Sequence, residues 1–269
     1  MTQPQALDQT QVHLMNDAEV ARFVVNGYHI IEPEFADGFN ENIAQQLDQL
    51  SENPGDAITE AVPQLNQVLT HPAVLGVLTS LLGHDYQVAG HRHWHNRPAG
   101  TGHMQWHQDS TNNRTKQIDR FLGLYYPRDV TPDMGPTIIV PGTQYRNAPT
   151  DRMATYTNLR GQIPLVVNAG SIAFTHYDMW HSAAANRSQV TRHMIKFLFH
   201  RTAPNTAPTW NHNPQALNQP LNWGGRDKAE DINNILAFSN PLGVSQSDHY
   251  KERTIRRQCW NYLMGEIKE

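Results

Sequence analysis

Apolar residues recur at helical spacing close to the N-terminus. Val20, Phe23 and Val24 fall on one face of a helix predicted for residues 16–27, whose first turn Asn16 is suited to cap. The same reading of the first third of the chain predicts a strand at 28–31 and further helices at 39–51 and 64–82.

The third of these helices contains a proline. Its apolar positions are Leu65, Val68, Leu69, Val74, Leu75, Leu78 and Leu82. Because proline lacks the backbone N–H that a helix interior needs, Pro72 is expected to split the stretch into two shorter helices, with Gly83 at the end of the second. Residues 1–85 are therefore expected to form a helical layer with one strand.

From residue 86 to residue 201 the pattern changes to short β-like runs separated by turn residues. The glycine and proline pairs at 135–136 and 141–142 bracket one such run. This organisation predicts a mainly β core with flanking helices, built as a sandwich or jelly roll. The expected strands are 87–95, 102–109, 120–126, 137–140, 165–167, 171–175 and 194–200.

Beyond residue 201 the chain becomes rich in proline and asparagine. Residues 203–222 are expected to form an ordered loop or a lid, followed by helices at about 228–238 and 247–265. All 269 residues fit one domain with a helical layer at 1–85, a β core at 86–201 and a C-terminal part at 202–269.

Composition favours a soluble protein that acts on small molecules. The 21 lysines and arginines nearly balance the 25 acidic residues, so the net charge does not indicate binding to nucleic acid or to an anionic membrane. The single cysteine, Cys259, excludes an internal disulfide and a thiolate metal cage. Without a signal peptide or a membrane-spanning run, a cytoplasmic location is expected.

Three side chains have the types and order of an iron site. His107 and Asp109 are two residues apart, which turns both to one face of an extended strand, and His181 follows 72 positions after Asp109. Together they match the two-histidine, one-carboxylate facial triad that leaves three metal positions open. Arg192 is the group best shaped to grip the carboxylate of an organic co-substrate.

A second His-x-Asp pair, His176 and Asp178, competes with the first. A barrel that takes this pair from an early strand and its last histidine from a late strand needs several strands between them. The histidines that remain in the β region after Asp178 follow too closely for that. We therefore assign the metal to the first pair and expect His176 in the core or at the edge of a pocket.

The histidines at 91, 93 and 95 permit another reading, a zinc or manganese site like that of a cupin isomerase. Such a site takes a glutamate as its usual carboxylate, and no glutamate occurs between Glu60 and Glu230. The absence of glutamate from this stretch also argues against a glycosidase that uses a glutamate as acid or base. The sequence contains no Gly-x-Ser-x-Gly motif of a serine hydrolase and no glycine loop of a nucleotide-binding protein.

Over residues 65–201 the chain resembles the phytanoyl-CoA dioxygenase family of iron(II)- and 2-oxoglutarate-dependent oxygenases. Several motifs of this family occur in the correct order: His71-Pro72 leading into Leu81-Leu82-Gly83, Asn96-Arg97-Pro98, Trp106-His107-Gln108-Asp109, Gly135-Pro136 through Pro141-Gly142-Thr143, and His181 through Asn186, Ser188 and Arg192.

The resemblance implies a double-stranded β-helix, or jelly roll, that uses Fe(II), 2-oxoglutarate and O2. It implies His107, Asp109 and His181 as iron ligands and Arg192 as the partner of the distal carboxylate of 2-oxoglutarate. His93 and Tyr125 match family positions that line the co-substrate pocket. The family often has a serine two residues after the late histidine, where this chain has Ala183, and Thr137 would supply a replacement hydroxyl.

The expected reaction is hydroxylation of an unactivated C–H bond of a small molecule, with release of succinate and CO2. Because the carboxylate ligand is present, hydroxylation is favoured over halogenation. Desaturation, epoxidation or ring closure would need no change in the ligands. Two alternatives stay open: a non-catalytic jelly-roll protein that binds a metal or small molecule, and a cupin-like isomerase using His93 and His95. The substrate and the oligomeric state are not indicated.

Overall fold

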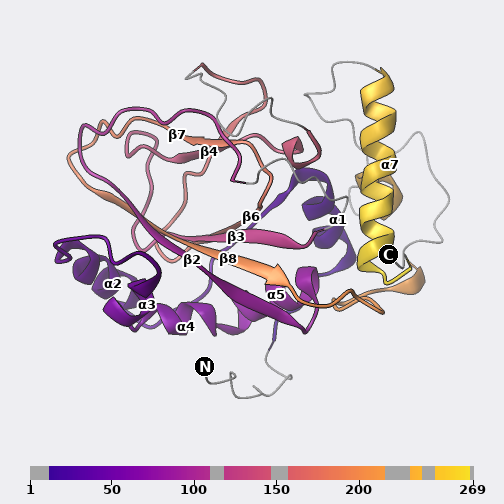
Figure 1. The fold of residues 1–269 in the computed structure, drawn as a ribbon, viewed down its shortest axis with the longest axis horizontal. Helices are drawn as coiled ribbons and strands as arrows, with labels where there is room; N and C mark the ends of the chain where they lie inside the picture. Colours follow the sequence, from indigo (N-terminus) through magenta and orange to yellow (C-terminus); the bar gives the residue numbers. More distant parts are fainter. Residues whose placement is uncertain (1–11, 110–117, 147–156, 216–230, 238–245, 267–269) are drawn as a thin grey trace.

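Two antiparallel sheets form the centre of the protein. The computed structural model describes residues 12–109, 118–146, 157–215, 231–237 and 246–266. The larger sheet has the strand order β1-β6-β3-β8-β2 and the smaller one the order β5-β4-β7. Their bounds are β1 Tyr28–Ile31, β2 Tyr86–Arg97, β3 Arg120–Tyr125, β4 Thr137–Ile139, β5 Ile163–Pro164, β6 Ile172–His176, β7 His181–Ala183 and β8 Arg192–Arg201. This is the predicted jelly-roll class, with β4 and β7 lying across from the larger sheet (Figure 1).

The helices of the first third cover one face of the larger sheet (Figure 1). Helix α1 begins after a capping box between Asn16 and Glu19 and ends at Gly27, whose φ of 74° favours glycine. Pro72 starts a new helix, as predicted, because His71 caps it and proline suits the first helical position. The helices are α1 Asp17–Asn26, α2 Phe39–Asp48, α3 Ile58–Ala61, α4 Leu65–Leu69, α5 Pro72–Leu82, α6 Ile232–Leu236 and α7 Gln246–Leu263, with short 3-10 turns at Gly55–Ala57 and Thr143–Tyr145.

Alternation along β3 divides its side chains between two apolar cores. Phe121 and Tyr125 belong to the core between the sheet and the helices, which also contains Phe23. Leu122 and Leu124 belong to a second core, inside the jelly roll. Since successive side chains of a strand point to opposite faces, this phase decides which residues can reach a site between the sheets.

Some predicted elements differ from the structure. Residues 102–109 form no strand, and only His107 makes an isolated bridge, to His181. The segment 165–167 likewise contributes one bridge, between Val130 and Val167, while the adjacent β5 pairs with β4. Strand β7 and helix α3 were not expected, because three or four residues carry too little periodicity to be recognised.

The C-terminal part follows the prediction in outline. Residues 203–213 form no regular element apart from a bridge between Asn16 and Asn211. Helix α6 lies within the predicted stretch 228–238, part of which falls outside the described residues. Helix α7 covers most of the predicted stretch 247–265 and begins one residue before it.

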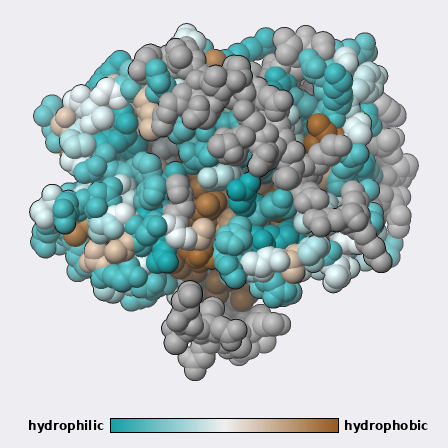
Figure 2. Space-filling view, viewed as in Figure 1, coloured by the Kyte–Doolittle hydropathy of each residue, from teal (hydrophilic) through white to brown (hydrophobic). Residues whose placement is uncertain are grey.

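In the view of Figure 2 the surface is mostly hydrophilic, and apolar residues are visible mainly in a recess near the centre. No helix in the described ranges is long and apolar enough to cross a membrane.

Candidate metal and co-substrate site

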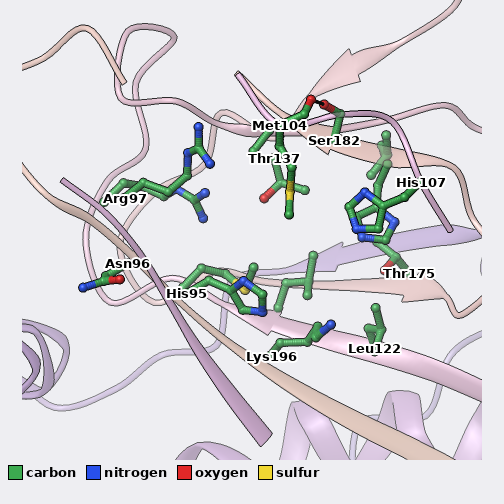
Figure 3. Close-up of a pocket in the computed structure, with 16 residues that line it drawn as sticks. His95, Asn96, Arg97, Met104, His107, Leu122, Thr137, Thr175, Ser182 and Lys196 are labelled. Carbon is green, nitrogen blue, oxygen red and sulfur yellow. Dashed lines mark hydrogen bonds between the residues drawn. The ribbon is translucent and has the colours of Figure 1, made fainter. Parts of the chain in front are cut away.

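A cavity of about 260 Å³ lies between the two sheets. The smaller sheet and the segment before His107 supply one wall, where Met104, Thr137 and Ser182 are seen in Figure 3. The larger sheet supplies the opposite wall through β2, β3, β6 and β8. The residues on that side are His95, Asn96, Arg97, Leu122, Leu124, Thr175, Arg192, Met194 and Lys196.

His107 and His181 come together through the backbone. The amide of His107 donates to the carbonyl of His181 at 3.0 Å, and the amide of His181 donates back at 2.8 Å. This antiparallel bridge brings the two ring centroids to 4.1 Å. Asp109 completes the group, with its Oδ1 at 3.8 Å from His107 Nε2 and 3.9 Å from His181 Nε2.

The two imidazoles are oriented by backbone carbonyls. His107 Nδ1 lies 3.0 Å from the carbonyl oxygen of Gln105, and His181 Nδ1 lies 3.0 Å from that of Met179. Because a carbonyl only accepts, Nδ1 carries the proton in each ring and the lone pair is on Nε2, the atom that faces Asp109. The ligand atoms of the three residues lie within 4.8 Å of one another, so these residues could hold a divalent metal ion.

Lys196 is a charged neighbour of this group that the sequence reading did not single out. Its Nζ donates to Asp109 Oδ2 at 3.0 Å, and its side chain is 8% exposed. Burial alone would raise the pKa of the Asp109 carboxyl, but His181, Lys196 and His107 outweigh it and hold that pKa below its ordinary range. Asp109 is therefore a carboxylate, which is the form that binds a metal.

The guanidinium of Arg97 lies at the opposite end of the cavity from His107 (Figure 3), and Arg192 also lines the cavity. Arg192 and Arg97 are direct partners across β8 and β2, so both point to the same face. Arg192 is 2% exposed, and its Nε and Nη1 are buried without a hydrogen-bond partner among the described residues. Burial lowers the pKa of Arg192 to about 10, which leaves it cationic at neutral pH. An anion would supply the partner that these donors lack.

Thr137 lies in the cavity wall directly across from Ala183 in the β4–β7 pair. The hydroxyl of Tyr126 donates to Thr137 Oγ1 at 3.1 Å. The hydroxyl of Ser182, beside Ala183, donates a hydrogen bond to the carbonyl of Met104 at 2.6 Å. Thr137 therefore places a hydroxyl directly across from Ala183, the position where the family often has a serine.

Two expected pocket residues lie elsewhere. Tyr125 points to the helical face, where its hydroxyl donates to Asn40 Oδ1 at 2.7 Å. His93 is next to His95, with 6.0 Å between ring centroids, but only His95 is in the cavity wall. The position of Tyr125 could have been predicted from strand alternation. Leu122 and Leu124 point into the cavity, so Tyr125, one residue later on β3, points to the other face.

The competing pair does not join the candidate metal-binding group, which consists of His107, Asp109 and His181. His176 accepts from the amide of Asp178 at 3.1 Å, and both side chains are buried. In the described part of the chain, one group of three or more potential ligands gathers closely, namely His107, Asp109 and His181.

His193, Trp106 and Trp180 pack outside the cavity wall. His193 points away from the cavity, accepts from Trp94 Nε1 at 3.1 Å and lies 2.7 Å from Asp48. Trp106 is buried in a small apolar cluster against which Trp180 packs.

Most of the arginines near the barrel have other partners. The Arg92 guanidinium donates to Thr59, and its backbone amide donates to Asp56. Arg128 pairs with Glu41 and Asp48, and Arg120 lies over the ring of Tyr177 at 5.0 Å. Arg114 lies outside the described residues.

The family model described as phytanoyl-CoA dioxygenase matches residues 12–194, about two thirds of the chain. The chain belongs to this family. Its members are iron(II)- and 2-oxoglutarate-dependent oxygenases, so the protein is an enzyme of this general class and the expected cofactors Fe(II), 2-oxoglutarate and O2 are confirmed. A search of curated proteins found no match.

Solved structures with the same fold are distant in sequence. HygX from Streptomyces hygroscopicus with nickel and 2-oxoglutarate bound is 15% identical with a TM-score of 0.57, over 70% of this chain and 88% of its own. The α-ketoglutarate-dependent epimerase SnoN from nogalamycin biosynthesis is 17% identical (TM-score 0.55, 69% and 80%). The non-heme monooxygenase ThoJ is also 17% identical (TM-score 0.55, 88% and 95%). At these identities the likeness concerns the fold.

Proposed function

We propose that the protein hydroxylates an unactivated C–H bond of a small molecule and couples this to conversion of 2-oxoglutarate and O2 into succinate and CO2. The observation that carries the proposal is the arrangement of the cavity. At one end His107, Asp109 and His181 converge, and at the other Arg192 has buried donors without a partner.

The donor set fits iron(II). Two imidazole nitrogens and one carboxylate oxygen on one side of the ion leave the remaining positions for co-substrate and O2. The carbonyls of Gln105 and Met179 hold both rings with Nε2 toward Asp109, so the rings would bind an ion there without reorienting. When bound, iron and 2-oxoglutarate supply the oxidising chemistry, and no side chain is needed as a general base.

Arg192 is proposed to bind the distal carboxylate of 2-oxoglutarate through Nε and an Nη atom. This fork is the geometry in which a guanidinium grips a carboxylate. Arg97, directly opposite, adds a second positive charge, and two like charges across a strand pair are unfavourable until an anion comes between them. Thr137 offers a hydroxyl on the facing wall.

The apolar wall residues serve to keep water away from the reacting carbon and to hold it in place. Leu122, Leu124 and Ile139 project into the same cavity as the metal-binding group. These side chains offer no polar group that would compete for the ion.

The experiment is succinate formation from 2-oxoglutarate under air with added iron(II) and ascorbate, which uncoupled turnover produces even without the true substrate. We expect activity in the natural protein and none in Asp109→Ala. A non-catalytic binding protein would form no succinate and show no iron-dependent binding of 2-oxoglutarate. A cupin-like isomerase using His93 and His95 would keep its metal in Asp109→Ala.

A further inference from the structure

Lys196 adds a positive charge that the proposed reaction does not use. It lies on β8 four residues after Arg192, so both side chains share the inward face. Three cations, Arg97, Arg192 and Lys196, line the cavity, against one carboxylate, that of Asp109, among the described residues that line or adjoin it. The cavity is therefore positively charged before any ligand enters.

Iron(II) and the two carboxylates of 2-oxoglutarate cancel each other in charge, so loading the site leaves this excess unchanged. Asp109 would then be shared between the ion at Oδ1 and Lys196 at Oδ2. A carboxylate drawn toward a divalent ion neutralises a neighbouring ammonium less completely. Because a buried ammonium without a counter-charge is costly, the loaded site favours one more anion near Lys196 Nζ.

His95 supplies a second donor beside Lys196. Both residues lie on the inward face of the β2–β8 pair, where His93 is the direct partner of Lys196 and His95 is the next inward residue (Figure 3). Burial and the nearby cations Lys196 and Arg192 lower the pKa of His95 to about 3, so the ring is neutral. Its Nε2 is buried and has no hydrogen-bond partner among the described residues. A neutral ring carries its proton on one of its two nitrogens, and with the proton on Nε2 the ring would donate to an anion.

We propose that the substrate is a carboxylic acid with an apolar body, whose carboxylate is held by Lys196 and His95. The apolar body follows from the walls formed by Leu122, Leu124 and Met194. This inference rests on the proposed function, because the carboxylate is placed relative to the metal-binding group.

The position of Lys196 also limits which carbon is oxidised. A metal–oxygen bond of about 2.1 Å, the width of the Asp109 carboxylate and the 3.0 Å contact to Nζ put the ammonium no more than roughly 7 Å from the ion. A carboxylate bound on the side of Nζ that faces the ion would bring its α and β carbons nearer to the ion than the far end of an extended chain. The reaction is therefore expected close to the acid group and not at the far end of the substrate.

The test is calorimetric titration of the protein loaded with nickel(II) and 2-oxoglutarate without O2, using butanoate, hexanoate and octanoate and their primary amides. Short probes are chosen because the cavity also has to hold 2-oxoglutarate. At least one acid should bind about tenfold or more tightly than its amide, since hydrogen bonds to charged groups are the stronger ones. Lys196→Met should abolish this preference, and Lys196→Arg should keep most of it.

Exposed Lys251→Met is the matched control and should behave as the natural protein. The assignment is wrong if the natural protein binds no acid more tightly than its amide, or if Lys196→Met keeps the preference. It is also wrong if Lys196→Met weakens 2-oxoglutarate binding instead, because Lys196 then serves the co-substrate. Failure of the proposed function would appear earlier, as no nickel-dependent binding of 2-oxoglutarate before any acid is added.

Discussion

Replacing Arg192 with methionine separates a ligand-binding role from a structural one. In the ligand-free protein this guanidinium is 2% exposed, and two of its nitrogens have no partner among the described residues. A buried charge without full pairing costs stability. Arg192→Met, which keeps the length and removes the charge, should therefore leave the melting temperature of the ligand-free protein unchanged or raise it.

Binding of 2-oxoglutarate should change in the opposite direction. Two hydrogen bonds to a carboxylate, at about 1.5–3 kcal/mol each, correspond to about 3–6 kcal/mol in total. Since each 1.4 kcal/mol is about tenfold in Kd, the loss lies between about 10² and 10⁴. Arg97 stays in place across the strand pair and should keep the effect at the lower end of this range.

The assay is anaerobic titration of 2-oxoglutarate into the iron(II)-loaded protein, followed by the visible absorption of the complex. Arg128→Met is a matched control, because this guanidinium pairs with Glu41 and Asp48 outside the cavity. It should leave the Kd unchanged. A Kd for Arg192→Met within threefold of the natural value would refute the reasoning, as would a large loss of stability without ligand.

Three further results are expected. Tyr125→Phe should leave the Kd for 2-oxoglutarate unchanged because its hydroxyl bonds Asn40, whereas Thr137→Val should raise that Kd about threefold to tenfold in the same titration. The pKa of His95 in the folded protein is about 3, below its ordinary value of 6.5, because of burial and nearby cations, so between these pH values the unfolded chain binds one more proton than the folded protein. The free energy of unfolding should therefore fall as the pH decreases across that interval, by up to about 1.4 kcal/mol per pH unit. Denaturant unfolding of His95→Gln should show a smaller fall. Gly27→Ala should lower the free energy of unfolding by about 1–2 kcal/mol or more. The reason is that φ at this position is 74° and the added Cβ would lie 2.5 Å from the buried side chain of Gln144. An unchanged free energy of unfolding would contradict this account of the turn.

The elements that local pattern determines were predicted well. The cap of α1 at Asn16, the break at Pro72 and the strands β3, β6 and β8 all follow from residues close together in the chain. The pairing of His107 with His181 joins residues 74 positions apart, and no local pattern encodes it. This explains why an irregular segment with one bridge was taken for the strand 102–109.

For the site, order and spacing in the sequence predicted His107, Asp109 and His181 as metal ligands and Arg192 as their co-substrate partner. The structure brings the three potential ligands within 4.8 Å of one another and places His107, His181 and Arg192 in the wall of one cavity. Lys196 was missed although alternation from Arg192 predicts that it shares the inward face. Tyr125 was taken from a family position, while the phase of its own strand points it outward. Arg97 was named only within the Asn96-Arg97-Pro98 motif and given no role, because its partnership with Arg192 depends on the register between β2 and β8.

The most direct measurement of the central claim is the equilibrium binding of iron(II), without O2, to two matched variants, one from each His-x-Asp pair. His107→Gln should lose binding by a factor of about 100 or more, because it removes one of three ligands. His176→Gln, in the buried pair that lies outside the metal-binding group, should bind one iron per chain as the natural protein does. Iron retained in His107→Gln, or lost only in His176→Gln, would contradict the account.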